Sequence, residues 1–271
     1  MNKSVVISIP VHEDYDVIID HLNNIKKFVP NSSVILHVSG DSHISLFNML
    51  NRSSENEFKG FLYINQKQYL TYSRFDAGEV RGLSTVHASN FRYINSLVKF
   101  DVFALETSND MFVRKGVESL WNNYECATTL STTSVEDWLA NTDQIGKDLI
   151  ANMNKFVEIK VTKKFPQEGS FYPREIFKQV SDIILDGLDN KLLSAEELVL
   201  HTLAYNIKPE LHESCVNDSY VFHDHRYGAT ANSDILSVRN GEKLNKYAVK
   251  RVPRVMQDPC RQFIRELTKN D

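Results

Sequence analysis

The chain has 271 residues, of which 42% are hydrophobic and 24% are charged. This length suffices for one large α/β domain or two small ones. The formal net charge of -4 argues against a general nucleic-acid binder, because such proteins need a basic surface to displace counterions from phosphates. A local basic patch remains compatible with this charge.

The N-terminal part of the chain predicts a β-α-β unit. Residues 5–11 and 34–38 are short, apolar and β-branched, as in buried strands, and residues 17–28 have apolar side chains at helical spacing. Such a unit implies two parallel strands joined by a right-handed crossover. Helices are expected next over residues 42–51, 85–97 and 111–124, and strands over residues 61–64 and 100–105.

The second half of the chain is expected to contain less sheet. Helices are predicted over residues 135–156, 174–188, 194–205 and 261–267, and a strand over residues 220–222. The sequence contains no repeat and no obvious linker. We therefore expect a single α/β domain over residues 1–271, with a mixed, mostly parallel sheet flanked by helices.

The cysteines and the lengths of the apolar segments indicate the cellular compartment of the protein. Cys126, Cys215 and Cys260 are widely spaced and form no CxxC pair, so no zinc knuckle or thioredoxin motif is indicated. Their odd, sparse number is typical of a reducing compartment. Residues 5–9 are too short for a signal peptide, and no apolar run could span a membrane. We expect a cytoplasmic protein, with peripheral membrane association still allowed.

Polar clusters follow the predicted strands at residues 12–14, 39–41 and 106–110. Ligands of open α/β sheets bind beyond the carboxyl ends of the strands. Asp and Asn at such places are also common turn formers and helix caps, which explains each cluster structurally when it is taken alone. Together they predict a polar binding crevice.

The predicted helix from residue 194 allows two interpretations. Ser194 and Glu197 have the spacing of a capping box, which would make both structural. Glu197 could instead be a general base held at the helix start. It also shares a helix face with His201, but no second ligand cluster supports a metal there. His223 and His225 would lie on one side of a strand, without any known metal-binding spacing.

The tail from residue 246 to residue 254 concentrates four cations: Lys246, Lys250, Arg251 and Arg254. A solvated basic segment explains them structurally. The functional alternative is a clamp for a diphosphate, in which Lys acts as a point charge and Arg as a bidentate fork.

Segments in the same order along nearly the whole chain resemble the core-2/I-branching β-1,6-N-acetylglucosaminyltransferases and the related peptide-O-xylosyltransferases. The opening strand ending in His12, and the second strand ending at Asp41, are similar to that family's first two strands. The other matching segments are residues 108–112, residues 168–172 with 194–203, and the tail with residues 247–252 and 258–259.

This resemblance implies a GT-A-like fold, a UDP-sugar donor, inversion at the anomeric carbon and no metal, hence no cofactor. It implies that Glu197 is the catalytic base and that Lys250 and Arg251 bind the diphosphate, with Arg254 beside them. Residues 1–125 would then form a nucleotide-binding half, and residues 126–271 an acceptor and catalytic half.

Further site residues are expected from the polar clusters and the resemblance. His12 and Asp41 would line the nucleotide pocket, and Asp110, Glu168 and Ser170 would contact the sugar, because carboxylates and hydroxyls accept hydrogen bonds from sugar hydroxyls.

The sequence also departs from the family pattern. Ser-Ala-Glu-Glu at residues 194–197 stands where the family has Ser-Pro-Asp-Glu, which leaves Glu196 as an alternative base. Residues 14–16 match the DxD pattern by which many GT-A enzymes hold a divalent ion, but they follow the first strand rather than a mid-sheet strand. We interpret them as negative charge at a helix N-terminus.

The expected partners are a nucleotide-sugar donor and a glycan or lipid-linked saccharide acceptor, as in polysaccharide biosynthesis, with no nucleic acid and no transmembrane segment. Two other functions remain open. One is a non-catalytic nucleotide- or carbohydrate-binding module. The other is a metal-dependent hydrolase that uses His201, His223 and His225.

Overall fold

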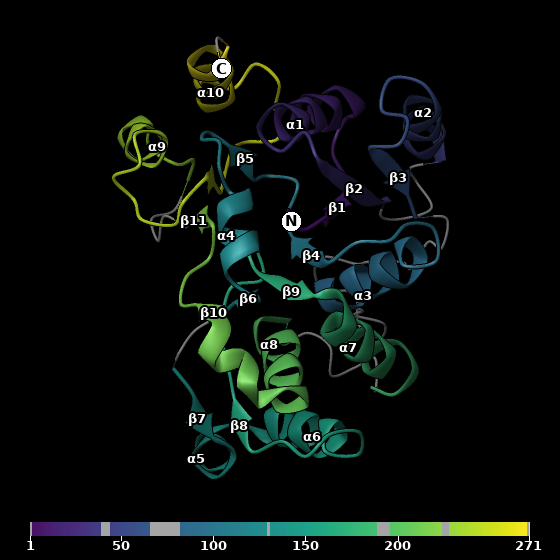
Figure 1. The fold of residues 1–271 in the computed structure, drawn as a ribbon, viewed down its shortest axis with the longest axis vertical. Helices are drawn as coiled ribbons and strands as arrows, with labels where there is room; N and C mark the ends of the chain where they lie inside the picture. Colours follow the sequence, from purple (N-terminus) through teal and green to yellow (C-terminus); the bar gives the residue numbers. More distant parts are fainter. Residues whose placement is uncertain are drawn as a thin grey trace.

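The computed structural model describes residues 2–38, 44–65, 82–128, 131–188, 196–223, 228–269 and 271. Its main sheet has the strand order β3-β2-β1-β4-β9 (Figure 1). These strands are β1 (Val5–Val11), β2 (Ser32–Val38), β3 (Leu62–Ile64), β4 (Val102–Leu105) and β9 (Phe171–Pro173). The first four are parallel and β9 is antiparallel to β4. The predicted mixed, mostly parallel sheet flanked by helices is confirmed.

Helices cover both faces of this sheet. One face carries α1 (Tyr15–Phe28) and α2 (Ile44–Glu55), and the other carries α3 (Leu83–Ile94), α7 (Arg174–Asp186) and α8 (Glu196–Ile207). Alternate residues of β1 pack on opposite faces of the sheet, because successive side chains of a strand point in opposite directions. Ile7 and Ile9 pack with α1, whereas Val6 packs with α3 and α7.

The remaining elements are short. A second sheet has the order β11-β12-β5 and consists of β5 (Met111–Phe112), β11 (Val221–Phe222) and β12 (Ala248–Val249). Two strand pairs are β6 (Cys126–Ala127) with β10 (Cys215–Val216), and β7 (Thr133–Ser134) with β8 (Val161–Thr162). The other helices are α4 (Glu118–Asn123), α5 (Val135–Asn141), α6 (Gln144–Met153), η3 (Pro209–Ser214), α9 (Asn232–Arg239) and α10 (Pro259–Thr268).

Two predicted helices differ from the structure. The expected helix over residues 111–124 begins instead as strand β5. The side-chain amide of Asn24 on α1 bonds both backbone groups of Phe112, at 2.8 Å each, and these groups are then unavailable to a helix. The expected helix over residues 135–156 is divided into α5 and α6, because the Asp143 side chain accepts a hydrogen bond from the Gly146 N–H at 2.9 Å and caps a new helix.

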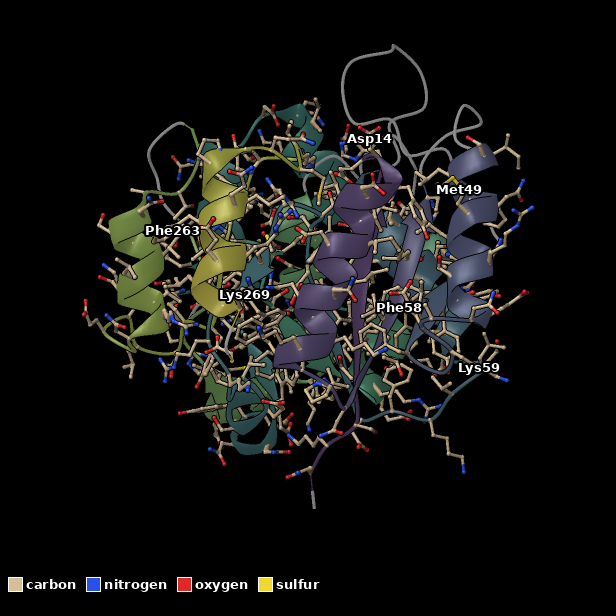
Figure 2. All side chains as sticks on the ribbon, turned by 90° about the horizontal axis from the view of Figure 1, so that it is seen from above. Asp14, Met49, Phe58, Lys59, Phe263 and Lys269 are labelled. Carbon is tan, nitrogen blue, oxygen red and sulfur yellow. A yellow bond between two sulfur atoms is a disulfide. The ribbon has the colours of Figure 1, made fainter. Side chains whose placement is uncertain are left out.

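Seen from above, α9, α10, α1 and α2 lie side by side as a row of helices (Figure 2). Arg261 of α10 is fully buried in this row and donates from Nη1 to Asp20 of α1 at 2.6 Å. The C-terminal helix is therefore fixed beside the helix that follows β1.

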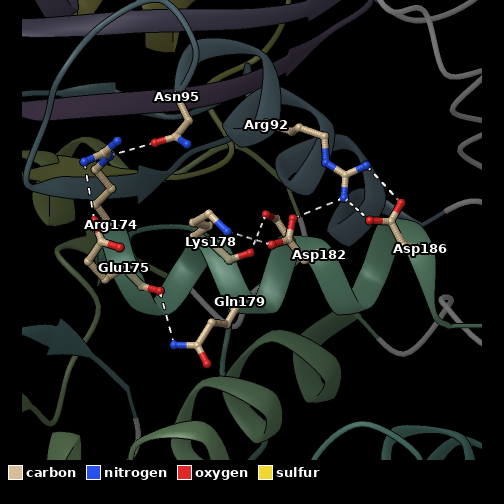
Figure 3. Close-up of polar contacts among 9 residues, drawn as sticks. Arg92, Asn95, Arg174, Glu175, Lys178, Gln179, Asp182 and Asp186 are labelled. Atoms are coloured by element: carbon tan, nitrogen blue, oxygen red, sulfur yellow. Dashed lines mark hydrogen bonds and ion pairs between the residues drawn. The ribbon is translucent and has the colours of Figure 1, made fainter.

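On the other side of the sheet, polar contacts join α3 to α7 (Figure 3). Arg92 of α3 donates to Asp182 and Asp186 of α7, and Arg174 of α7 donates to Asn95 at 2.7 Å. These side chains are partly exposed, so each ion pair contributes little to stability. A buried aromatic cluster that includes Phe91, Phe103 and Phe177 packs α3 and α7 against β4.

The cysteines are not all unpaired. Cys126 and Cys215 face each other in the β6–β10 pair and form a disulfide, while Cys260 is buried and free. Disulfides persist mainly in oxidising compartments. The odd number of cysteines is therefore not an indication of a reducing compartment. None of the described helices is both long and apolar enough to cross a membrane.

The core on the α7 and α8 side makes a direct stability prediction. Leu203 of α8 is fully buried, and Leu244 is 78% exposed. Leu203→Ala should lower the free energy of unfolding by about 2–5 kcal/mol, through lost burial and a residual cavity. The matched change Leu244→Ala should alter it by less than about 0.5 kcal/mol. Urea unfolding measures both, and equal effects would refute the assignment of Leu203 to the core.

Candidate functional site

The carboxyl ends of β1 and β4 bring two of the predicted polar clusters together. The strands are parallel neighbours, with Ser8 opposite Leu105, so residues 12–13 and 106–110 emerge at the same edge of the sheet. The third predicted cluster, which includes Asp41, lies outside the described residues. Several buried ionisable side chains lie at this edge, among them Glu13, Glu106 and Asp110.

Glu13 is the buried acid at the end of β1. Its side chain is 1% exposed and forms an ion pair with Arg254 Nε, and it accepts a hydrogen bond from the Ser108 hydroxyl. The backbone N–H of His12 donates to its other oxygen at 3.0 Å. His12 itself is half-exposed beside this carboxylate. Arg254, predicted as a diphosphate ligand, therefore lies directly beside the predicted nucleotide residue His12.

The turn after β4 is built by Asp110. Its Oδ2 accepts a hydrogen bond from the Thr107 N–H at 2.8 Å, and the Asp110 side chain is completely buried. The turn also anchors the basic tail, because the Val252 N–H donates to the Asn109 carbonyl at 3.0 Å. Residues that are far apart in the sequence are thus held in register at the sheet edge.

The tail reaches the site as strand β12. It pairs with β5 on one side and β11 on the other, and Lys250 follows immediately. Arg251 has a φ of 63°, a left-handed conformation that is unfavourable for a side chain of this size and is common at functional sites. The strand therefore places Lys250 beside Asp110 and Arg254 beside Glu13, with Arg251 next to Lys250 in the chain.

Lys250 forms an ion pair with Glu168. Gly169, next to Glu168, has a φ of 74°, and a Cβ there would lie 2.6 Å from the Val221 nitrogen. Only glycine fits this position. Ser170, predicted to contact the sugar, is fully buried, and its hydroxyl donates to the Gln167 carbonyl at 2.6 Å. The Glu-Gly-Ser segment is thus a tight turn that points Glu168 at Lys250.

Asp110 and Glu168 have opposite pKa shifts although they are close together. Burial, followed by the negative charge of Glu168, raises the pKa of Asp110 well above its usual range. Burial also acts to raise the pKa of Glu168, but the charge and hydrogen bond of Lys250 outweigh it and lower the pKa. Of the two carboxyls, Asp110 is therefore the one that favours its protonated form, and Glu168 the one that favours its ionised form.

A second buried pair lies directly behind this one. Glu106 accepts a hydrogen bond from the Tyr220 hydroxyl at 2.9 Å, and its other oxygen lies 3.8 Å from Nε2 of His21 on α1. Burial raises the pKa of Glu106 to about 8 and lowers the pKa of His21 to about 4. Both side chains are therefore mainly uncharged near pH 7.

Several buried polar atoms of this cluster have no hydrogen-bond partner among the described residues. They are His21 Nε2, Glu106 Oε2, Asp110 Oδ1, Arg251 Nη1 and Arg261 Nη2. Buried polar groups are nearly always paired in folded proteins, and exceptions often mark functional sites. The concentration of such atoms at one sheet edge is our main reason to place the functional site here.

Glu197, the predicted base, lies at the start of α8 and away from the described contacts of this cluster. Its side chain is 52% exposed and its carboxylate lies 3.6 Å from Lys164 Nζ. A backbone hydrogen bond links the start of α8 to the segment that carries Glu168. The Phe165 N–H donates to the Glu197 carbonyl at 3.0 Å, and Glu168 lies three residues after Phe165. Ser194 and the side chain of Glu196 lie outside the described part.

The histidines of the predicted hydrolase are found in different surroundings. His201 is buried against Tyr172, with Nδ1 2.8 Å from its hydroxyl, whereas His223 contacts the Glu168 carbonyl at 3.4 Å. His225 lies outside the described residues. No described contact joins His201 to His223, so the structure gives the hydrolase interpretation no support.

Sequence analysis placed Glu106 in a predicted polar cluster without giving it a role, and it did not identify His21, Tyr220 or Arg261 as site residues. One signal was present: His21 is a polar residue on the apolar face of the predicted helix over residues 17–28. Its pairing with Glu106 depends on how α1 packs on the sheet, which the sequence pattern does not specify.

No protein-family model matches the sequence, and no curated protein matches it either. Among solved structures, the chain is similar to a mannosyltransferase, PcManGT from Pyrobaculum calidifontis, in complex with GDP-Man and Mn2+. The identity is 13% and the TM-score 0.42, over 70% of this chain and 48% of that one. The chain thus spans about half the length of that protein.

The chain is also similar to an active-site mutant of LgtC, with 8% identity and a TM-score of 0.45, over 97% of this chain and 95% of that one. At these TM-scores neither likeness assigns a function, which must be inferred from the site.

The expectation that no cofactor takes part is contradicted, because the mannosyltransferase structure contains Mn2+ together with GDP-Man. We therefore withdraw it. Within the described part of the chain, no group of three or more His, Cys, Asp or Glu side chains is placed to hold a metal ion. Asp41 and Asp224 are not among the described residues. We derive no step through a metal.

The buried acid Glu106 predicts a specific pH dependence of stability. Its pKa rises on folding from the ordinary 4.5 to about 8, so the folded state binds more protons between these values and stability falls as the pH rises through this window. Glu106→Gln removes this contribution and should keep the hydrogen bond from Tyr220.

Urea unfolding at pH 5 and pH 8 provides the measurement. The unaltered protein should lose more stability between these pH values than the Glu106→Gln variant. An equal loss in both proteins would show that Glu106 is ionised in the folded state.

Proposed function

We propose that the protein is an inverting glycosyltransferase that moves a sugar from a UDP-sugar to a hydroxyl of a glycan or lipid-linked saccharide acceptor. The observation that carries this proposal is the convergence of Lys250 and Arg254, with Arg251 between them in the chain, at the carboxyl ends of β1 and β4. That edge is where open α/β sheets bind nucleotides. Residues 1–125 would bind the nucleotide, and residues 126–271 would supply the acceptor and catalytic groups.

In this proposal the three cations bind the diphosphate. Arg251 has a buried Nη1 without a described partner, which suits it to a phosphate oxygen. Lys250 and Arg254 are 22% and 39% exposed in their side chains, so both can be reached by a ligand. Their positive charge would stabilise the negative charge that develops on the departing diphosphate.

The proposed reaction is a direct displacement. The acceptor oxygen attacks the anomeric carbon, the bond from that carbon to the diphosphate oxygen breaks, and UDP leaves with the electron pair. Glu197 takes the proton from the acceptor hydroxyl. General base catalysis of this kind contributes about 10²–10⁴-fold to the rate. The exposure of Glu197 on the side of α8 would let an acceptor approach from solvent.

The donor sugar would lie between these groups. Asp110 and Glu168 face the cations and are our candidates for contacts with sugar hydroxyls, because a carboxyl accepts several hydrogen bonds. Ser170 would act through the turn that it holds, since its hydroxyl is committed to Gln167. His12, half-exposed beside Glu13, and Asp41 would contact the nucleoside.

A second candidate is a binding module that holds a nucleotide or carbohydrate without turnover. It is favoured by one observation, the ion pair between Glu197 and Lys164 at the surface, which is also what a base that has lost its role would form. Binding of UDP-sugars without transfer or hydrolysis would identify this function.

The proposed base predicts a separation of catalysis from binding. Glu197→Gln should reduce sugar transfer by about 10²–10⁴-fold, because the amide cannot accept the acceptor proton, while the affinity for UDP stays within about twofold, as expected for a change remote from the diphosphate. Transfer is measured with a UDP-sugar panel, and UDP binding by calorimetry.

The neighbouring acid provides the matched control. Glu196→Gln should retain transfer. If Glu197→Gln is fully active and Glu196→Gln is not, the base has been assigned to the wrong residue.

The proposed clamp predicts a loss of nucleotide affinity. Lys250→Met combined with Glu168→Gln removes both charges and avoids leaving one of them buried alone. Compared with Glu168→Gln alone, the double variant should bind UDP about 10–100-fold more weakly, the effect expected when a charge-assisted hydrogen bond of about 1.5–3 kcal/mol is lost. Binding of uridine, which lacks phosphate, should change much less.

Lys160→Met is the control, because Lys160 forms only an exposed ion pair with Glu158. Equal UDP affinity in the double variant and in Glu168→Gln alone would exclude Lys250 from the clamp.

A further inference from the structure

Two of the proposed phosphate-binding cations already face carboxylates. Lys250 is paired with Glu168, and Arg254 with Glu13. A phosphate that binds these cations must compete with the carboxylates for them. What happens to the displaced carboxylate is therefore part of the binding reaction.

Glu13 and Glu168 differ in what holds them once their cation is taken. Glu13 keeps hydrogen bonds from the Ser108 hydroxyl and the His12 N–H. The Glu168 carboxylate has Lys250 as its only described side-chain hydrogen-bond donor. A backbone hydrogen bond also reaches Glu168, but no other described side chain donates to it, so of these two carboxylates Glu168 depends more on its cation.

The other charged and titratable groups facing Glu168 come from every element packed around it. Asp110 after β4, His223 after β11 and His87 on α3 interact with Glu168 directly. Behind them, Glu106 acts on Asp110, and Lys246, which precedes β12, acts on His223. Burial lowers the pKa values of His87 to about 3 and of His223 to about 4, so both are neutral near pH 7. Lys246 is engaged by Asp218 at 2.5 Å. Within the described cluster, Lys250 alone neutralises Glu168.

We propose that a diphosphate group takes Lys250 from Glu168 and that the released carboxylate binds one proton from solvent, so that anion binding and proton uptake are coupled at this site. The proposal rests on the diphosphate clamp proposed above. The step is balanced: one O–H bond forms on Glu168, one solvent proton is consumed, and no electrons are transferred. The protonated carboxyl can then donate a hydrogen bond to a phosphate or sugar oxygen.

Electrostatics explains why Glu168 cannot simply remain ionised. The group is 13% exposed in its side chain, and burial by itself raises its pKa. Without Lys250, and with a phosphate dianion nearby, both the lost attraction and the new repulsion favour the neutral form. Burial and the charge of Glu168 already raise the pKa of Asp110, whereas Lys250 holds the pKa of Glu168 down, so the loss of Lys250 acts most directly on Glu168.

The direction of the pH effect follows from linkage. The bound state has the higher Glu168 pKa and so holds more protons between the free and the bound values, which makes the affinity for the anion rise as the pH falls through this window. The limit is about a tenfold change in Kd for each pH unit when one proton is taken up.

Calorimetric titration with UDP at pH 7, in buffers with different ionisation enthalpies, counts the protons directly. The unaltered protein should take up close to one proton more per UDP than the Glu168→Gln variant. Any proton that UDP itself releases or binds is the same for both proteins and cancels in this difference. The variant should also bind UDP about tenfold more tightly, because the competing carboxylate charge is gone. Glu158→Gln, an exposed acid in an ion pair with Lys160, should behave as the unaltered protein.

The outcomes separate this inference from the proposed function. If UDP binds with the same proton count in the unaltered protein and in Glu168→Gln, the coupling is refuted while the clamp stands. If UDP does not bind at all, both proposals fail. Should Glu168→Gln not fold, the pH dependence of the Kd of the unaltered protein for UDP decides. After correction for the ionisation of UDP itself, UDP should bind more tightly at pH 6 than at pH 8. A corrected Kd that is the same at both pH values would overturn the coupling.

Discussion

The Lys250–Glu168 ion pair beside the fully buried Asp110 is the constraint on which the arrangement of the site depends. Two carboxyls and one ammonium lie together there, and the raised pKa of Asp110 favours its neutral form, which lessens the repulsion between the carboxyls. The Gly169 turn aims Glu168, the Thr107 N–H orients Asp110, and strand β12 delivers Lys250. A change in any of these supports would leave a charge buried without its partner, which is costly in free energy. The local fold therefore positions the charged side chains, and the pairing of these side chains in turn stabilises the local fold.

The fold explains how residues so far apart in the chain meet. Strands β1 and β4 are parallel neighbours, so the segments that follow them leave the sheet together. The tail returns to that edge because β12 pairs with β5, whose position is fixed by the side chain of Asn24 on α1. Arg261 then ties α10 to α1 through Asp20. The sheet provides the edge, and the C-terminal segment brings the cations that complete it.

Hydrophobic periodicity was enough to predict the main strands and most helices, because β1, β2 and β4 are buried apolar runs and α1 has a clear apolar face. It failed at residues 111–112, where the Asn24 side chain decides the backbone conformation. The cation tail and the clusters after β1 and β4 were found from the sequence. The pairing of Lys250 with Glu168, of Arg254 with Glu13, and of His21 with Glu106 depends on tertiary packing, and no local pattern encodes it.

The central claim is that this sheet edge binds a nucleotide diphosphate-sugar. A thermal-shift panel of uridine and guanosine nucleotides, with and without attached sugars, tests it most directly, because a ligand that binds only the folded state raises the melting temperature. UDP and UDP-sugars should raise it by about 4 °C or more at saturating concentration, and uridine should raise it much less. Equal shifts with uridine and UDP, or no shift with any nucleotide, would contradict the claim.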